Sequence, residues 1–161
     1  MSSIAEAATS SRSAGQAGSL MVNVDDIPWV PFALDGTFFK PLHFDDDQGK
    51  ATFILKVPAG QVTPAHKHLA AVEAYVIQGG FTYPGEGSVR AGGYTYEPGG
   101  CIHAPAPDGD EDLILFVVAQ GGVLGMSDDG EPLGVIDNDL MREFAQAGGI
   151  PSDKVGGNAD W

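Results

Sequence analysis

The sequence has few cysteines, few basic residues and no long apolar run, and each shortage excludes a class of protein. Cys101 is the single cysteine among 161 residues, which excludes an internal disulfide framework and favours a reducing, cytoplasmic setting. No run approaches the ~18 apolar residues of a membrane span. Eight basic residues stand against 22 acidic ones, and the net charge of −14 repels phosphate backbones and anionic lipids. We therefore expect neither a nucleic-acid-binding protein nor a membrane protein.

Length and composition predict a single globular domain. One domain is the expectation for a chain of about 150 residues, and 43% apolar with 19% charged residues is ordinary for such a domain. Residues 1–20 are small, polar and aperiodic and lack the apolar centre of a secretory signal, so they predict a disordered N-terminal arm. Residues 21–150 would then form the domain, and residues 151–161 an irregular C-terminal tail.

Short extended runs separated by turn residues predict an all-β fold. The 23 glycines and 11 prolines lie largely between these runs, where turns need them. Strands are expected at residues 37–44, 51–57, 73–83, 94–97, 113–118 and 123–126. Runs at this spacing are typical of a β-sandwich or β-barrel. One short C-terminal helix is expected to begin at Asp137 or Asn138 and to end at Gly148 and Gly149.

The run at residues 113–118, Leu-Ile-Leu-Phe-Val-Val, is apolar on both of its faces. A half-exposed strand would alternate apolar and polar residues, so something must cover the second face of this one. A second layer of the same chain is one candidate and a partner subunit is the other. On the second interpretation the protein is a homodimer or a higher homo-oligomer.

Three of the four histidines form a pattern that indicates a metal site. His66 and His68 lie two residues apart, so in a strand both imidazoles face one side while Lys67 points outward. His103 follows a separate turn, and Glu73 lies five residues after His68. Neutral imidazoles bind first-row divalent metals, and a carboxylate strengthens such a site. The alternative is a hydrogen-bonded or surface pair of histidines.

The spacing of these residues forms two separated motifs. The first is G-x5-H-x-H-x4-E-x6-G over residues 60–80, and the second is G-x5-P-x-G-x2-H over residues 92–103. The two strings resemble the paired signature motifs of the cupin superfamily, with Pro107 in place of the final asparagine. This resemblance implies an all-β double-stranded β-helix, the cupin jelly roll. It also implies a set of metal ligands, namely His66, His68, Glu73 and His103.

Shorter strings between residues 27 and 137 resemble the small single-domain cupin dioxygenases, which cleave carbon–carbon bonds in acetylacetone or 2,4′-dihydroxyacetophenone. The strings are Pro28-Trp-Val-Pro31, Phe39-Lys-Pro-Leu42, Tyr75-Val-Ile-Gln-Gly79, Tyr96-Glu-Pro-Gly99 and Asp128-Asp-Gly130. The likeness implies Fe(II), although imidazole ligands also suit Zn, Ni or Mn. The iron sites of the enzymes that the sequence resembles consist of three histidines, without a ligating glutamate. Glu73 is therefore either a fourth ligand or a residue just outside the ligand set.

Two further residues are predicted to act in catalysis. Glu97, six residues before His103, matches by resemblance an acid near the metal in the acetylacetone-cleaving enzymes. Facing inward, it could hold a metal-bound water or orient a histidine; facing outward, it would be a solvated carboxylate. Tyr75 and Ile77 share strand parity with Glu73 and are expected to face the metal cavity.

These observations predict a metal-dependent dioxygenase that uses O₂ to cleave a carbon–carbon bond in a small diketone, hydroxyketone or enol. The nearest basic candidate on the predicted inward face is Arg90, and none is adjacent to a ligand, so a neutral chelating substrate fits better than a polyanion. Two alternatives stay open, because fold does not dictate function. One is a metal-dependent isomerase, hydrolase or lyase, and the other is a metal-containing small-molecule sensor or binding module.

Overall fold

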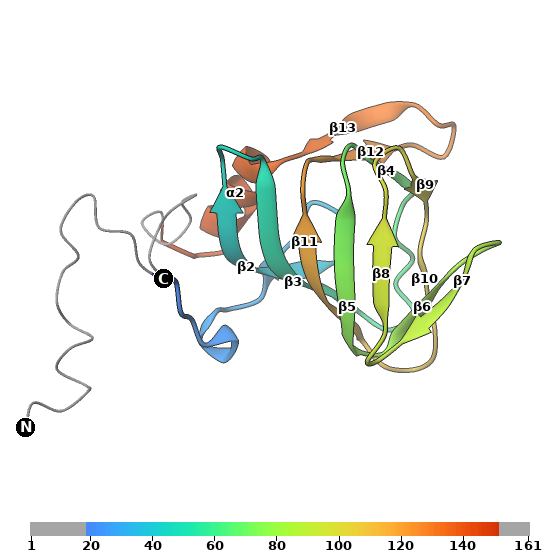
Figure 1. Ribbon diagram of the computed structural model, residues 1–161, viewed down its shortest axis with the longest axis horizontal. Coiled ribbons are helices and arrows are strands. Elements are labelled where there is room, and N and C mark those ends of the chain that lie inside the picture. Colours follow the sequence, from blue (N-terminus) through green and yellow to red (C-terminus); the bar gives the residue numbers. More distant parts are fainter. Residues whose placement is uncertain (1–18, 152–161) are drawn as a thin grey trace, which may run out of the picture.

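The computed structural model describes residues 19–151, and in this range the chain consists of short β-strands and one α-helix (Figure 1). The predicted arm at residues 1–18 and the tail at residues 152–161 lie outside the described residues. The strands are β1 (Val30–Pro31), β2 (Phe38–Asp45), β3 (Lys50–Val57), β4 (His66–His68), β5 (Val72–Gln78), β6 (Gly80–Tyr83), β7 (Gly87–Arg90), β8 (Tyr94–Glu97), β9 (Ile102–His103), β10 (Ala106–Pro107), β11 (Leu113–Ala119), β12 (Val123–Met126) and β13 (Pro132–Ile136). A 3-10 helix, η1 (Val24–Asp26), precedes them, and α2 (Asn138–Ala147) follows.

The strands form three antiparallel sheets around a shared interior. The largest has the order β1-β2-β3-β11-β5-β8, a second has the order β13-β12-β4-β9, and a third has the order β10-β6-β7. Figure 1 shows the large sheet in front of β4, β9 and β12. Side chains from β3, β5 and β11 meet side chains from β4, β6 and β12 across one cavity. The predicted all-β jelly roll with a C-terminal helix is therefore confirmed.

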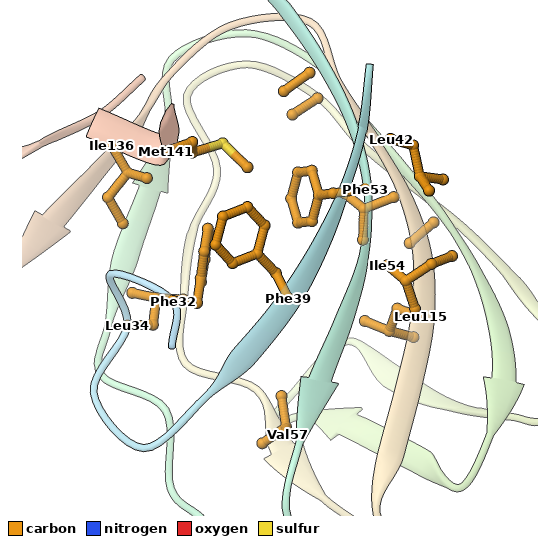
Figure 2. Packing of buried hydrophobic residues seen from close by; sticks show 14 of the residues in the cluster. Phe32, Leu34, Phe39, Leu42, Phe53, Ile54, Val57, Leu115, Ile136 and Met141 are labelled. Carbon is orange, nitrogen blue, oxygen red and sulfur yellow. The ribbon is translucent and has the colours of Figure 1, made fainter. Parts of the chain in front are cut away.

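The core is centred on three phenylalanines between the large sheet and α2. Phe32, Phe39 and Phe53 have ring centroids 5.1–6.2 Å apart, and Met141 of α2 lies beside them (Figure 2). Alternate residues of β3 and β11 continue this packing, because successive side chains of a strand face opposite sides. The apolar interior continues from this cluster toward the histidines, since Phe32, Phe53 and His66 line the same cavity.

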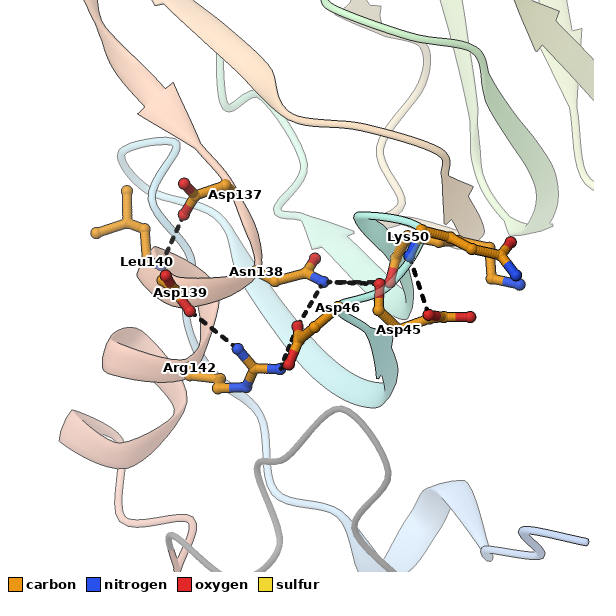
Figure 3. Close-up of polar contacts among 9 residues, drawn as sticks. Asp45, Asp46, Lys50, Asp137, Asn138, Asp139, Leu140 and Arg142 are labelled. Carbon is orange, nitrogen blue, oxygen red and sulfur yellow. Dashed lines mark hydrogen bonds and ion pairs between the residues drawn. The ribbon is translucent and has the colours of Figure 1, made fainter. Parts of the chain in front are cut away.

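The C-terminal helix begins and ends where the sequence predicts. The side chain of Asp137 accepts a hydrogen bond from the Leu140 amide at 3.0 Å, and Gly148 terminates the helix. Asn138 and Arg142 donate hydrogen bonds to Asp46 in the turn between β2 and β3 (Figure 3). The helix is thereby fixed to one end of the large sheet. Among the residues that the structure describes, no helix is long and apolar enough to cross a membrane.

The strand expected at residues 73–83 is two strands, and this prediction was wrong in that respect. The chain bends at Gly79, which has φ +73°, and a Cβ atom there would lie 2.8 Å from the carbonyl oxygen of Asp112. Only glycine tolerates both conditions. As a result β5 belongs to the large sheet and β6 to the three-stranded one. The strands β7 and β13 were not predicted, because both are largely exposed and interrupted by glycine or proline.

The outer face of the large sheet carries exposed aromatic side chains. Phe116 of β11 pairs with Tyr75 of β5, which pairs with Tyr94 of β8, and the exposed fractions are 37%, 49% and 58%. The expectation that Tyr75 and Ile77 face the metal cavity is wrong, since both are half exposed while the intervening Val76 is fully buried. No other described segment covers Phe116, and the homodimer remains a prediction.

Candidate metal centre

Three histidines lie together on the inner face of the sheet formed by β4 and β9. His66 and His68 share one side of β4, and His103 of β9 stands directly opposite His66 in the antiparallel register. The turn before β9 fixes this register: the His68 amide donates to the Cys101 carbonyl, and the Gly100 amide donates to the His68 carbonyl. Gly100 permits that turn with φ +95°. The prediction that His66 and His68 face the same side is confirmed.

The three imidazoles form a tight, buried cluster. Their ring centroids are 4.8–5.1 Å apart, and one nitrogen from each ring lies within 4.8 Å of the others. Each of the three residues is less than 9% exposed. The Nε2 atoms of His68 and His103 are 2.9 Å apart. Nδ1 of His66 lies 3.1 Å from the Pro64 carbonyl, a contact that would orient the ring with Nε2 toward the cluster.

Glu97 is the carboxylate that reaches this cluster. Its Oε2 atom lies 3.1 Å from His68 Nε2 and 3.4 Å from His103 Nε2. Its Oε1 atom accepts hydrogen bonds from the Tyr83 hydroxyl at 2.8 Å and the Thr95 hydroxyl at 3.2 Å. Glu97 faces inward because it pairs with the buried Val72 in the register of β5 and β8. Both carboxylate oxygens are therefore fixed by neighbouring side chains.

Burial lowers the pKa of two of the histidines, and hydrogen bonds lower the pKa of Glu97. Burial lowers the pKa of His68 to about 4, although the charge of Glu97 acts in the opposite direction, and it also lowers the pKa of His66. Burial raises the pKa of Glu97, but hydrogen bonds with His103 and Tyr83 outweigh it and leave that pKa below its ordinary value. At neutral pH His66 and His68 are neutral and Glu97 is ionised. These are the forms that bind a metal ion.

The donor set fits a divalent metal ion. Two Nε2 atoms and one carboxylate oxygen lie 2.9–3.4 Å from each other, close to the ~3 Å between neighbouring ligands of a metal with bonds of about 2.1 Å. A carboxylate oxygen only accepts, and a neutral imidazole carries one N–H, so a cation at the centre would attract all three atoms. The Nδ1 atoms of His68 and His103 have no hydrogen-bond partner among residues 19–151. The three buried histidines could hold a metal ion, and the donors do not select which one.

An apolar cavity of about 90 Å³ adjoins the cluster. Apart from His66, His68 and Glu97, most of its lining is aliphatic or aromatic, with Thr63 and Tyr83 as the other polar members. No lysine or arginine of the described residues lines it. For comparison, a dry apolar cavity of ~150 Å³ binds benzene. The space beside the histidines therefore suits a small, uncharged molecule.

The structure does not bring Glu73 or Tyr75 to the histidines. Both lie on the outer face of β5, and the Glu73 carboxylate accepts a hydrogen bond from the hydroxyl of Tyr94. This corrects the expectation that Glu73 is the carboxylate beside the metal and that Tyr75 faces the cavity. The carboxylate beside the histidines is that of Glu97. Of the two orientations expected for Glu97, the structure has the inward one. Arg90 of β7 is exposed and does not line the cavity.

Tyr83 is a site residue that sequence reasoning missed. Its ring stacks on His103 with centroids 3.9 Å apart and planes 10° from parallel, and its hydroxyl donates to Glu97. Burial and the nearby charge of Glu97 raise the pKa of Tyr83, so it stays a phenol. The available signal was the parity that Tyr83 shares with the buried Phe81, but an aromatic residue at the end of a strand is usually core. Its functional position depends on the bend at Gly79.

Comparison with known proteins gives one family and several related folds. The model of the ChrR cupin-like domain matches residues 17–122. An RmlC-like cupin protein from Ralstonia eutropha JMP134 is 29% identical with a TM-score of 0.72, and the match covers 84% of this chain and 91% of that one. No curated protein sequence matches the chain significantly.

Two more distant structures show the fold alone. An acetylacetone dioxygenase from Acinetobacter johnsonii is 20% identical with a TM-score of 0.73, and the match covers 86% of this chain and 98% of that one. A chain in the complex of Rhodobacter sphaeroides SigE with the anti-sigma ChrR is 22% identical with a TM-score of 0.52, covering 60% and 50%. The family match spans more than half of the sequence, and the jelly roll agrees with it. The protein belongs to the cupin superfamily, in the family of ChrR cupin-like domains.

Proposed function

We propose that the protein is a metal-dependent dioxygenase that cleaves a carbon–carbon bond in a small, neutral diketone, hydroxyketone or enol. The observation that carries the proposal is the pairing of a buried three-histidine cluster with a small apolar cavity that no lysine or arginine of the described residues lines. An anionic substrate would require a cationic partner in such a pocket. A neutral diketone requires none, since its own oxygens can meet the metal. The similarity to the fold of an acetylacetone dioxygenase supports the same choice.

In this proposal His66, His68 and His103 hold Fe(II). Imidazole ligands suit iron among the first-row metals, and three of them would leave coordination positions open for the substrate and O₂. The bound ion would supply Lewis acidity toward the substrate oxygens and electrons for the reaction with O₂. Glu97 is ionised and adjacent to the histidines, so it can accept the proton that a diketone loses on becoming its enolate. The apolar walls exclude water from the reacting carbon atoms.

The direct test is oxygen consumption by protein loaded with Fe(II) under anaerobic conditions. A panel of β-diketones and α-hydroxyketones is added in an oxygen electrode, and products are identified by mass spectrometry. We expect uptake of one O₂ for each carbon–carbon bond cleaved, with metal-free and Zn-loaded protein as inactive controls. Absence of uptake across the panel at full iron occupancy would exclude the proposed activity.

A sensor or binding module is the second candidate, because the family is that of the ChrR cupin-like domain and an anti-sigma complex shares the fold. A metal-dependent isomerase, hydrolase or lyase is the other alternative. Elemental analysis of protein from unsupplemented cultures and turnover under nitrogen separate these cases. Tight retention of a ligand without turnover would favour the sensor, and turnover without O₂ would favour the non-oxygenase enzyme.

We also propose that the protein is a homodimer that packs through the outer face of the large sheet. Five large side chains there are 37–58% exposed: Tyr75, Ile77, Tyr94, Tyr96 and Phe116. Residues of this size, about half exposed, offer on the order of 500 Å² for burial, which is more than half of the ~800 Å² that a partner contributes to a standard interface. Light scattering should give twice the monomer mass for the native protein and a lower mass for Phe116→Glu. A native monomer would contradict the proposal.

A further inference from the structure

A second cavity adjoins the histidine cluster and shares Phe81, Tyr83 and Glu97 with the apolar one. It measures about 300 Å³ and lies among β6, β7, β8 and the turn before β9. His103 lines this second cavity, whereas His66 and His68 line the apolar one. Its lining is more polar and includes Glu86, Ser88 and Tyr94. The proposed metal centre is therefore bordered by two spaces of different size and character.

Tyr83 stands between these two spaces. Together with Phe81 and Glu97 it lines both of them. Its ring is held flat against His103, and its hydroxyl is hydrogen-bonded to Glu97. These two contacts hold the aromatic ring in place beside the cluster. The proposed reaction does not use the Tyr83 ring, so the role of the ring between the two cavities needs a separate explanation.

We propose that Tyr83 determines which ligands reach the metal centre: its ring closes the apolar cavity against the second cavity, and its hydroxyl holds Glu97 in position. This inference rests on the proposed metal site. With the ring in place, the apolar cavity of about 90 Å³ is smaller than the ~150 Å³ cavity that binds benzene, so it admits only a small group of a ligand. Without the ring, a longer ligand could keep its chelating end at the histidines and extend into the second cavity. Tyr83 is then a specificity-determining and positioning residue.

Two substitutions separate the two roles of Tyr83. Tyr83→Phe keeps the ring and its stacking on His103 but removes the hydrogen bond to Glu97. Tyr83→Ala removes the ring as well. Tyr75→Ala is the matched control, because Tyr75 lies on the outer face of the large sheet and lines neither cavity. Each protein is loaded with Co(II), whose visible absorption reports ligands at the metal without any need for turnover.

The probes are acetylacetone, 1-phenyl-1,3-butanedione and 1,3-diphenyl-1,3-propanedione, titrated into each Co(II) protein. We expect the native protein and Tyr75→Ala to prefer acetylacetone over the diphenyl compound, and Tyr83→Ala to reduce this preference by about 10- to 100-fold. Tyr83→Phe should keep the native preference while binding Co(II) about tenfold more weakly in competition with a chelator, because Glu97 loses its support. If Tyr83→Ala does not fold, Tyr83→Leu replaces it with the same expectation.

The outcomes distinguish this inference from the proposed function. A native size preference in Tyr83→Ala at full Co(II) occupancy would overturn the specificity role. Native Co(II) affinity and an unchanged Co(II) spectrum in Tyr83→Phe would overturn the positioning role. Failure of the native protein to bind Co(II) would instead overturn the metal site, and with it the proposed function. Widened ligand binding without O₂ consumption in the Fe(II) protein would support the role of Tyr83 and contradict the dioxygenase alone.

Discussion

Replacing His103 by alanine should lower the affinity of the protein for Fe(II) or Co(II) by about 100-fold or more and abolish oxygen consumption. Residues that only support metal ligands typically cost 10- to 100-fold when they are replaced, so loss of one of three imidazoles should cost at least the upper value. His103 also contributes the face on which Tyr83 stacks. Its removal takes away a donor and loosens the wall beside it. Metal content by elemental analysis and affinity by chelator competition measure the effect.

His43→Ala is the matched control for this experiment. It removes the fourth histidine of the chain, which lies on β2 opposite Thr52 and outside the cluster. We expect His43→Ala to bind metal and consume oxygen as the native protein does. Circular dichroism must show that both variants fold. Native metal affinity in a folded His103→Ala variant would show that the cluster is not the metal site.

The second large effect is expected at Glu97, and Glu73 provides its internal comparison. Glu97→Gln keeps the size of the side chain and an acceptor for the Tyr83 hydroxyl, but it removes the negative charge beside His68 and His103. We expect a loss of about 10- to 100-fold in metal affinity or in turnover. Glu73→Gln should change neither by more than about twofold, because exposed charges distant from a site contribute little. Parallel chelator competition and oxygen-electrode assays measure both variants.

The comparison decides between two carboxylates that the sequence could not separate. If Glu73→Gln weakened metal binding and Glu97→Gln did not, the ligand set implied by the motif would be correct and the assignment of Glu97 wrong. If both substitutions weakened metal binding, a change on the outer face of β5 would have to alter the histidine cluster. The Tyr94→Phe variant tests that case, because it removes the hydrogen bond to Glu73 and leaves Glu97 untouched.

Much of the fold could be predicted because its signals are local. The strands at Tyr94–Glu97 and Val123–Met126 have the predicted bounds, and α2 begins after Asp137 as its capping residue requires. The failures occurred where a local signal was weak or misleading. Residues 73–83 read as one extended run, although Gly79 redirects the chain into another sheet. β13 has an exposed, irregular pattern that no alternation rule detects.

The orientation of a candidate site residue could likewise be predicted only where the signal was local. His66 and His68 belong to one strand, so the rule that alternate residues share a face holds for them. Glu73 lies beyond Leu69, Ala70 and Ala71, where the chain leaves the four-stranded sheet that contains β4 and enters the large one. Glu73 was expected at the site from the resemblance to the motif, and Tyr75 from its parity with Glu73, so the inward face of β5 had to come from its packing.

The sequence by itself determined that this protein is an all-β domain with a C-terminal helix and that three histidines from two distant motifs share a site. The first conclusion depends on patterns within single strands and turns, which the chain encodes locally, and the second depends on the resemblance of the two motifs to the cupin signatures. Tertiary structure alone decided that Glu97 rather than Glu73 joins the histidines, that Tyr75 lies outside, and that Tyr83 separates two cavities. These facts depend on which sheet each strand joins and in which register, and that is fixed only when non-local strands pair.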